Sequence, residues 1–117
     1  MATLNTQAKL SSATKVAGEF TLDFTQLTDI TFSDAAGDSS SIPTGSYTTI
    51  VDGTHSDETY VYLKNAGSNR IKMFDTSVEY GSVNPGCWVF FAVPASKILK
   101  LQAVTSATDC NYITFKV

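Results

Sequence analysis

The sequence predicts an all-β protein, a single β-sandwich of seven to nine strands of the jelly-roll or immunoglobulin-like type. Apolar residues recur at every second position in a series of short segments, and this period of two is that of a half-buried strand. The 117 residues include 16 Thr and 13 Ser but only 16% charged residues, a composition that favours strands over long helices. A helical period is absent except for one turn expected around Ser96.

The first half of the chain contains three segments with strand-like patterns. Phe20, Leu22 and Phe24 alternate with polar residues, as expected for a strand with one buried face. Segment 34–45 is small, acidic and Ser-rich, and it is therefore predicted to be a loop. The strands expected in this half span residues 19–25, 29–33 and 47–51, followed by a polar connection over 52–58.

The second half alternates more clearly. Segment 65–69 is rich in Asn and Gly and is predicted to be a hairpin loop. The Pro85-Gly86 pair predicts a β-turn, because Pro presets its first central position and Gly accepts a positive φ at the second. Segment 87–93 is apolar on both faces and is predicted to be a central, covered strand. The strands expected here span residues 59–64, 70–75, 78–83, 87–93, 98–103 and 111–117.

The inward positions of these strands define the expected core. In the last strand, Ile113 and Phe115 are predicted to point inward, and Tyr112 and Thr114 outward. The predicted core consists of Phe20, Leu22, Phe24, Val61, Leu63, Ile71, Val89, Phe91, Leu99, Leu101, Ile113 and Phe115.

The N-terminal residues differ from the rest. Among residues 1–16, only Leu4, Leu10 and Val16 are large and apolar. So few anchors cannot offset the entropy of ordering the segment. We therefore expect residues 1–16 to form an N-terminal arm or an edge strand, and residues 17–117 to form the sandwich domain.

The charge distribution argues against a nucleic-acid partner and leaves open whether copies of the chain contact one another. The net charge is −3, and no basic patch is present that could release counterions from nucleic acid. Residues 1–59 carry two Lys and eight acidic residues, a sum of −6, whereas residues 60–117 carry six basic and three acidic residues, a sum of +3. This asymmetry is either chance or a basis for head-to-tail contact between copies.

Neither a targeting segment nor a membrane span is expected. Residues 1–10 lack the apolar stretch of a signal peptide, and the longest uncharged run, 81–96, is short and broken by Pro and Gly. The chain is therefore expected to be made in a cytoplasm and to remain soluble. Cys87 and Cys110 are expected to be free, buried thiols in such a reducing compartment, and a disulfide between them is the alternative. Trp88 follows Cys87 too closely for the immunoglobulin Cys–Trp–Cys pattern.

No enzymatic or metal motif stands out. His55, the only histidine, lies near Asp52, Asp57 and Glu58, which resembles a hydrolytic or metal site, but a lone His in a polar loop favours a solvated side chain. We therefore expect neither an enzyme nor a cofactor. A calcium site is the alternative, although the loop spacing matches no EF-hand. The acids that could build one are Asp34, Asp38, Asp52, Asp57 and Glu58.

The aromatic residues offer two interpretations. Tyr47, Tyr60, Tyr62, Tyr80 and Trp88 could form a sugar-stacking strip, although packing within the sheet is the usual role of aromatics in strands. Tyr60 and Tyr62 are the outward pair of their strand, and Tyr is enriched at protein interfaces. These two are therefore the better candidates for a protein contact.

The C-terminal half also resembles a known group of proteins. The residues that carry the resemblance are the segments Tyr60-Val61-Tyr62-Leu63-Lys64-Asn65-Ala66-Gly67-Ser68-Asn69, Asn84-Pro85-Gly86, Ile98-Leu99-Lys100-Leu101-Gln102-Ala103 and Tyr112-Ile113-Thr114-Phe115. Over residues 59–117 the chain resembles small β-sandwich virion proteins of tailed bacteriophages. It departs from them after Pro85-Gly86, where Cys87 and Trp88 stand in place of an acidic residue.

The resemblance implies a structural role in a virion. The first expectation is a capsid decoration or cement protein on the head surface, a trimer that bridges major-capsid subunits, with no nucleic-acid or membrane partner. The alternatives are a neck, tail or fibre-attachment subunit and, after these, a carbohydrate- or receptor-binding module. The residues expected to contact the capsid protein or other copies are Leu4, Lys9, Leu10, Lys15, Val16, Tyr60 and Tyr62.

Overall fold

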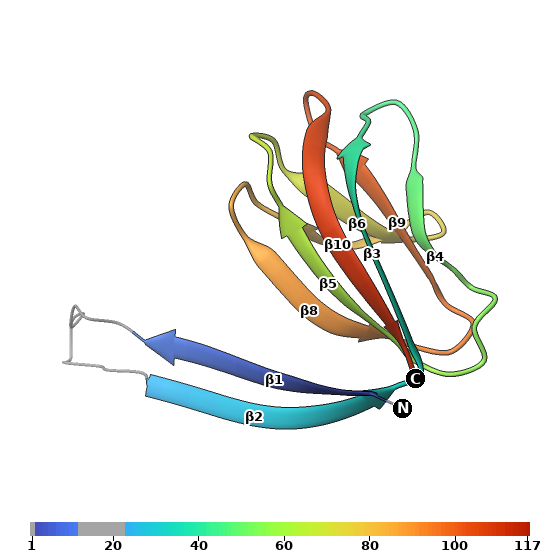
Figure 1. The fold of residues 1–117 in the computed structure, drawn as a ribbon. Coiled ribbons are helices and arrows are strands. Elements are labelled where there is room, and N and C mark those ends of the chain that lie inside the picture. Colours follow the sequence, from blue (N-terminus) through green and yellow to red (C-terminus); the bar gives the residue numbers. More distant parts are fainter. Residues whose placement is uncertain (1, 12–22) are drawn as a thin grey trace. The chain divides into compact units, whose positions relative to one another are not determined.

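The computed structural model describes residues 2–11 and 23–117, and these form two compact units, Met1–Phe32 and Ser33–Val117 (Figure 1). All regular structure in the described residues is β-strand. None of these residues belongs to a helix long and apolar enough to cross a membrane. The unit boundary lies after Phe32, later in the chain than the boundary after residue 16 predicted from the sequence.

The larger unit confirms the predicted β-sandwich, with eight strands in two antiparallel four-stranded sheets. Sheet I has the order β3-β10-β5-β8 and sheet II the order β4-β9-β6-β7. Every connection except that between β6 and β7 passes from one sheet to the other, which is the jelly-roll arrangement (Figure 1). The strands are β3 (Asp34–Ile42), β4 (Thr48–Asp52), β5 (Thr59–Asn65), β6 (Ile71–Asp75), β7 (Val78–Val83), β8 (Trp88–Val93), β9 (Ile98–Ala103) and β10 (Thr108–Lys116).

The core lies between the two sheets. It consists of the buried residues Ile42, Val51, Val61, Leu63, Ile71, Met73, Val83, Val93, Leu99, Leu101, Ala103 and Cys110. Five of the predicted core residues belong to it: Val61, Leu63, Ile71, Leu99 and Leu101. Val89 and Phe91 pack against it and are partly buried, whereas Phe20 and Leu22, and the side chain of Phe24, lie outside the part that the structure describes.

The prediction of which residues of the last strand face inward was wrong: Tyr112 and Thr114 share the inner side with Cys110, and the residues predicted to point inward lie on the outer side. In β10 the inner positions are occupied by Thr108 and Cys110, so Ile113 lies on the outer face, where it is 37% exposed. Phe115 lies on the same outer face as Ile113, because residues two apart share a face. It is nevertheless buried, as predicted, and its ring lies 6.4 Å from that of Phe90.

Segment 34–45 was predicted to be a loop, but most of it forms β3, the edge strand of sheet I. Its residues pair with β10 without a register shift, from Asp34 opposite Lys116 to Ile42 opposite Thr108. Ile42 is fully buried and anchors the end of the strand in the core. The small hydroxylated residues of this segment resemble a loop in composition, yet ladder hydrogen bonds and one buried anchor place it in the sheet.

The hairpin loop predicted at residues 65–69 is not observed. Residues 65–69 join β5 to β6 across the sandwich and do not form a hairpin, since these strands belong to different sheets. Asn65 is fully buried there, and its amide donates to Asn69 O at 2.7 Å and to Val83 O at 2.9 Å. Gly67 has no positive φ, but a Cβ at this position would overlap Thr108 Oγ1.

The Pro85-Gly86 turn is confirmed: Gly86 has φ 77°, and the backbone N–H of Cys87 donates to Asn84 O at 3.0 Å. The strand that follows was placed wrongly. β8 is an edge strand of sheet I, and only Val93 is buried among its residues. β8 is therefore apolar on both sides for another reason than the predicted coverage: one side faces the core, and the other carries aromatic residues on the outer surface of sheet I.

The smaller unit is an antiparallel pair of strands, β1 (Ala2–Ser11) and β2 (Asp23–Phe32). The register runs without interruption from Ala2 opposite Phe32 to Ser11 opposite Asp23. Residues 2–11 are therefore a strand, one of the two forms expected for the N-terminal segment. The described parts of the strands predicted at 19–25 and 29–33 belong to one strand, which pairs with β1 and not with either sheet of the sandwich, and residues 19–22 lie outside the described residues.

Candidate functional site

The outer face of sheet I carries a cluster of aromatic and apolar side chains from three adjacent strands. The pairing register builds it: Tyr62 lies opposite Phe90 on one side and opposite Ile113 on the other. Tyr60 lies opposite Phe115 on β10. We call this surface the aromatic face, and its members are Tyr60, Tyr62, Trp88, Phe90, Ile113 and Phe115.

Alternation along β5 explains why these residues point outward. Val61 and Leu63 are fully buried between the sheets, so Tyr60 and Tyr62 must lie on the opposite side of the strand. Both tyrosines are partly exposed. This confirms the predicted orientation of the four side chains, while their role in a protein contact stays a prediction.

Ring contacts hold the aromatic face together. The rings of Tyr60 and Phe90 are stacked with centroids 5.8 Å apart, and those of Tyr62 and Trp88 are 6.1 Å apart. Each such pair is worth about 0.5–1.5 kcal/mol beyond area burial. Trp88 nevertheless remains 54% exposed, which is unusual for so large an apolar side chain. The result is a partly exposed apolar surface.

The edge strand β3, next to β10, carries only small side chains on the outer side of sheet I. Ala35, Gly37 and Ser39 of β3 lie opposite the outer residues of β10. A Cβ at Gly37 would approach Ile113 Cγ1 to 3.2 Å, so glycine lets the isoleucine side chain lie across β3. The aromatic face is therefore bordered by β3, which has no bulky side chains there.

Acid–base chemistry is not supported on the aromatic face. Partial desolvation, together with the nearby Glu58 carboxylate, raises the pKa of the Tyr60 phenol above its usual value of 10.0. The phenol is therefore neutral at physiological pH. This surface can pack and donate hydrogen bonds, which are properties of a contact surface.

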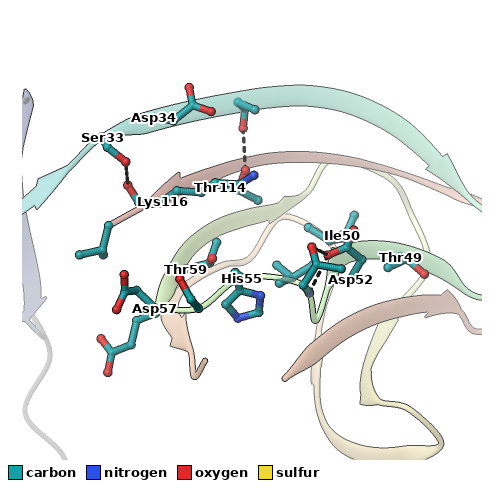
Figure 2. A pocket seen from close by; sticks show the side chains of 16 residues that line it. Ser33, Asp34, Thr49, Ile50, Asp52, His55, Asp57, Thr59, Thr114 and Lys116 are labelled. Atoms are coloured by element: carbon teal, nitrogen blue, oxygen red, sulfur yellow. Dashed lines mark hydrogen bonds between the residues drawn. The ribbon is translucent and has the colours of Figure 1, made fainter. Parts of the chain in front are cut away.

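A second candidate site is a cavity of about 700 Å³ at one end of the sandwich (Figure 2). The start of β3, the end of β10, strand β4 and the β4–β5 loop line it. His55 and Lys116 contribute to this lining, together with Asp34, Asp52, Asp57 and Glu58. The fold thus brings together four of the five acids singled out in the sequence, while Asp38 lies on β3 outside the cavity lining.

The histidine in this cavity is held by the backbone and not by a carboxylate. His55 Nε2 donates to Pro94 O at 2.8 Å, since a carbonyl oxygen can only accept. Nδ1 is buried and has no hydrogen-bond partner in the described part of the chain. A hydrolytic pair needs a carboxylate that orients the imidazole, and the described residues provide none at this atom.

One of the acids, Asp52, makes hydrogen bonds within its own loop. The Asp52 carboxylate accepts from Thr54 Oγ1 at 2.7 Å and from Thr54 N at 3.0 Å, and these bonds lower the pKa of Asp52. This closes the turn that begins the β4–β5 loop. Within residues 2–11 and 23–117, no three His, Cys, Asp or Glu side chains are arranged to hold a metal ion. The calcium alternative therefore gains no support from these residues.

The two cysteines are free and lie in different surroundings. Cys110 is buried in β10, and burial raises the pKa of its thiol to about 11. Cys87 is exposed in the turn before β8, contrary to the buried position expected from the sequence.

The residues predicted to contact partners fall into three groups. Leu4, Lys9 and Leu10 lie in β1, Tyr60 and Tyr62 lie on the aromatic face, and Lys15 and Val16 lie outside the described residues. Sequence reasoning did not include Trp88, Phe90 and Ile113 in this set. The alternation of Trp88 and Phe90 with Val89 and Phe91 was a usable signal, but only the pairing register reveals which set faces outward.

Comparisons with known proteins inform only the fold. No protein-family model and no curated protein sequence matches the chain. One solved structure, described as "Bacillus endospore appendages form a novel family of disulfide-linked pili", is similar with a TM-score of 0.51 and 15% sequence identity. The match covers 72% of this chain and 86% of that chain, and it supports the β-sandwich assignment.

Proposed function

We propose that the chain is a structural subunit of a multi-copy protein assembly, and specifically a decoration or cement protein on the head of a tailed-phage virion. The observation that carries this proposal is the aromatic face, in which Trp88 is 54% exposed. Contiguous exposed apolar surface of this kind is a feature of protein interaction sites. Aromatic residues are also the ones that contribute most at such interfaces.

Two further points support the virion assignment. The segments of residues 59–117 resemble small virion proteins of tailed phages, and jelly-roll sandwiches are common among viral capsid proteins. The fold alone does not decide function, so the surface chemistry must carry the argument. On this proposal the chain is made in the bacterial cytoplasm, forms trimers and bridges major-capsid subunits without a cofactor.

A fibre, neck or tail subunit is the second candidate. The solved structure to which the sandwich is similar is described as belonging to a family of pili, which are fibres. A surface that recurs by symmetry would serve a fibre as well as a head lattice. The two candidates differ in where the copies lie and in how many there are.

Imaging of reconstituted particles tests the proposal. Purified protein is added to phage heads that lack it, and its density is located by cryo-electron microscopy. Copies spread evenly over the head support the decoration role, copies at one vertex or in fibres support the second candidate, and no binding contradicts the decoration role. Trp88→Lys should abolish occupancy, whereas Val78→Lys, at a site on sheet II that is 67% exposed, should leave it unchanged.

A further inference from the structure

The aromatic face has opposite charges at its two ends. Lys64 lies opposite Trp88 near the end of β5, and its exposed side chain forms no ion pair in the part of the chain that the structure describes. Glu58 is also exposed; it immediately precedes β5, and its carboxylate lies near the Tyr60 phenol. Because residues two apart share a face, both charged residues stand on the tyrosine side of β5.

The surface between these two ends carries no charge. Two rows of outer residues cross sheet I there, and their members are all uncharged: Ala35, Gly37, Tyr60, Tyr62, Phe90, Ala92, Ile113 and Phe115. The aromatic face is therefore an apolar surface with one positive end and one negative end. Such a surface is electrostatically complementary to a second copy of itself that is turned end to end.

We propose that the aromatic faces of two copies pack against each other in a twofold-symmetric dimer, with Lys64 of each copy paired with Glu58 of the other. This inference deepens the proposed function, on which it rests for treating the aromatic face as an assembly surface. In a twofold contact the same patch serves both copies, so each residue contact occurs twice. The dimer therefore contains two ion pairs, one at each end of the paired faces.

The charges select one of the two ways in which the faces can stack. If the twofold axis crosses the strands midway between Glu58 and Lys64, each lysine faces a glutamate. If the axis runs along the strands, lysine faces lysine and glutamate faces glutamate, and these like charges repel. The first arrangement also sets the bulky ring of Phe90 against the small Ala92 of the other copy. Packed sheets lie about 10 Å apart, a distance that the long side chains of Lys and Glu can span together.

The size of the face indicates a weak dimer. Strands lie about 4.8 Å apart and rise about 3.3 Å per residue, so sheet I presents roughly 20 Å by 20 Å between Glu58 and Lys64. Two such faces bury about 800 Å² together, which is at the low end for specific interfaces, so the dimer should form only at high protein concentration. On a head, this contact would join copies of neighbouring trimers, and its repetition over many copies would make a weak contact sufficient.

Charge reversal tests the pairing, with full-length variants studied by sedimentation velocity over a range of concentrations. Lys64→Glu and Glu58→Lys each turn two attractive pairs into two repulsive ones. We therefore expect each variant to raise the dissociation constant of the dimer about tenfold or more. The matched control is Lys100→Glu, which makes the same change on the outer side of sheet II, between the buried Leu99 and Leu101. This control should leave the dissociation constant unchanged.

Mixing the two defective variants is the decisive step. The Lys64→Glu copy keeps Glu58 and the Glu58→Lys copy keeps Lys64, so a heterodimer of the two regains both attractive pairs. We expect an equimolar mixture to dimerise as the wild type does, and the double variant Lys64→Glu/Glu58→Lys to do the same on its own. A loss of dimerisation that neither the mixture nor the double variant restores would overturn the inference.

A wild type that is monomeric at every concentration would also overturn the inference, as would self-association that the charge reversals leave unchanged. The inference and the proposed function can fail separately. A wild type that stays monomeric in solution and still binds to heads contradicts only the inference, whereas a dimer that does not bind to heads contradicts only the decoration role.

Discussion

The outer faces of the two sheets share one architecture and differ in chemistry. On sheet II, Lys72 pairs with Glu79 at 3.6 Å, and Lys100 lies 5.6 Å from the ring centroid of Tyr47. On sheet I, the aromatic face has Trp88 at its edge, 54% exposed. Charged pairs suit a surface in water, whereas exposed aromatic rings suit a surface that meets protein. The contrast indicates which side of the sandwich is available for assembly.

The largest expected effect comes from the inner side of sheet I. Leu63→Ala removes a fully buried side chain from the core and should lower the free energy of unfolding by about 2–5 kcal/mol. Its neighbour Tyr62 should cost less, because Tyr62→Ala removes a side chain that is only partly buried, together with a ring contact with Trp88 worth about 0.5–1.5 kcal/mol beyond area burial. Urea denaturation of both variants measures the difference. Equal losses would contradict the distinction between an inner structural face and an outer contact face.

The next effect concerns alkaline pH. Burial raises the pKa of Cys110 from 9.0 to about 11, so the folded state holds a proton that the unfolded state loses first. Stability should therefore be fully present below pH 9 and fall as pH rises from about 9 to about 11, by up to about 1.4 kcal/mol per pH unit. Cys110→Ala should flatten this part of the profile. A slope that is unchanged in the variant would assign the loss to other groups.

The smallest effect is expected on the outer face of sheet II. Lys72→Ala removes the ion pair with Glu79, whose side chains are 31% and 43% exposed. Exposed pairs contribute about 0–1 kcal/mol, so the stability change should be small. Self-assembly should be unaffected, as sedimentation velocity can determine. Loss of assembly in Lys72→Ala would show that both outer faces take part.

The sequence predicted those parts of the fold that depend on local patterns. Alternation identified the buried positions of β5, β6 and β9, such as Leu63, Ile71 and Leu99. The pair Pro85-Gly86 identified a turn through the conformational preferences of its own residues. These features need no knowledge of which strands are neighbours.

The parts that were missed depend on pairing between distant segments. Segment 34–42 has the composition of a loop and becomes a strand only through its pairing with β10. Ile113 has the pattern of a core residue, but its register against Tyr62 places it on the outer face. The full extent of the aromatic face was missed for the same reason, because Phe90 and Ile113 become neighbours of Tyr62 only after β5, β8 and β10 have paired.

The most direct test of the central claim uses the single tryptophan of the chain, Trp88. Its side chain is 54% exposed in the isolated chain and lies in the aromatic face. If this face is the assembly surface, the emission of Trp88 should shift to shorter wavelength, and its quenching by iodide should fall, when the protein assembles with itself or on phage heads. Assembled protein in which Trp88 remains as red-emitting and as readily quenched as in the free chain would contradict the account.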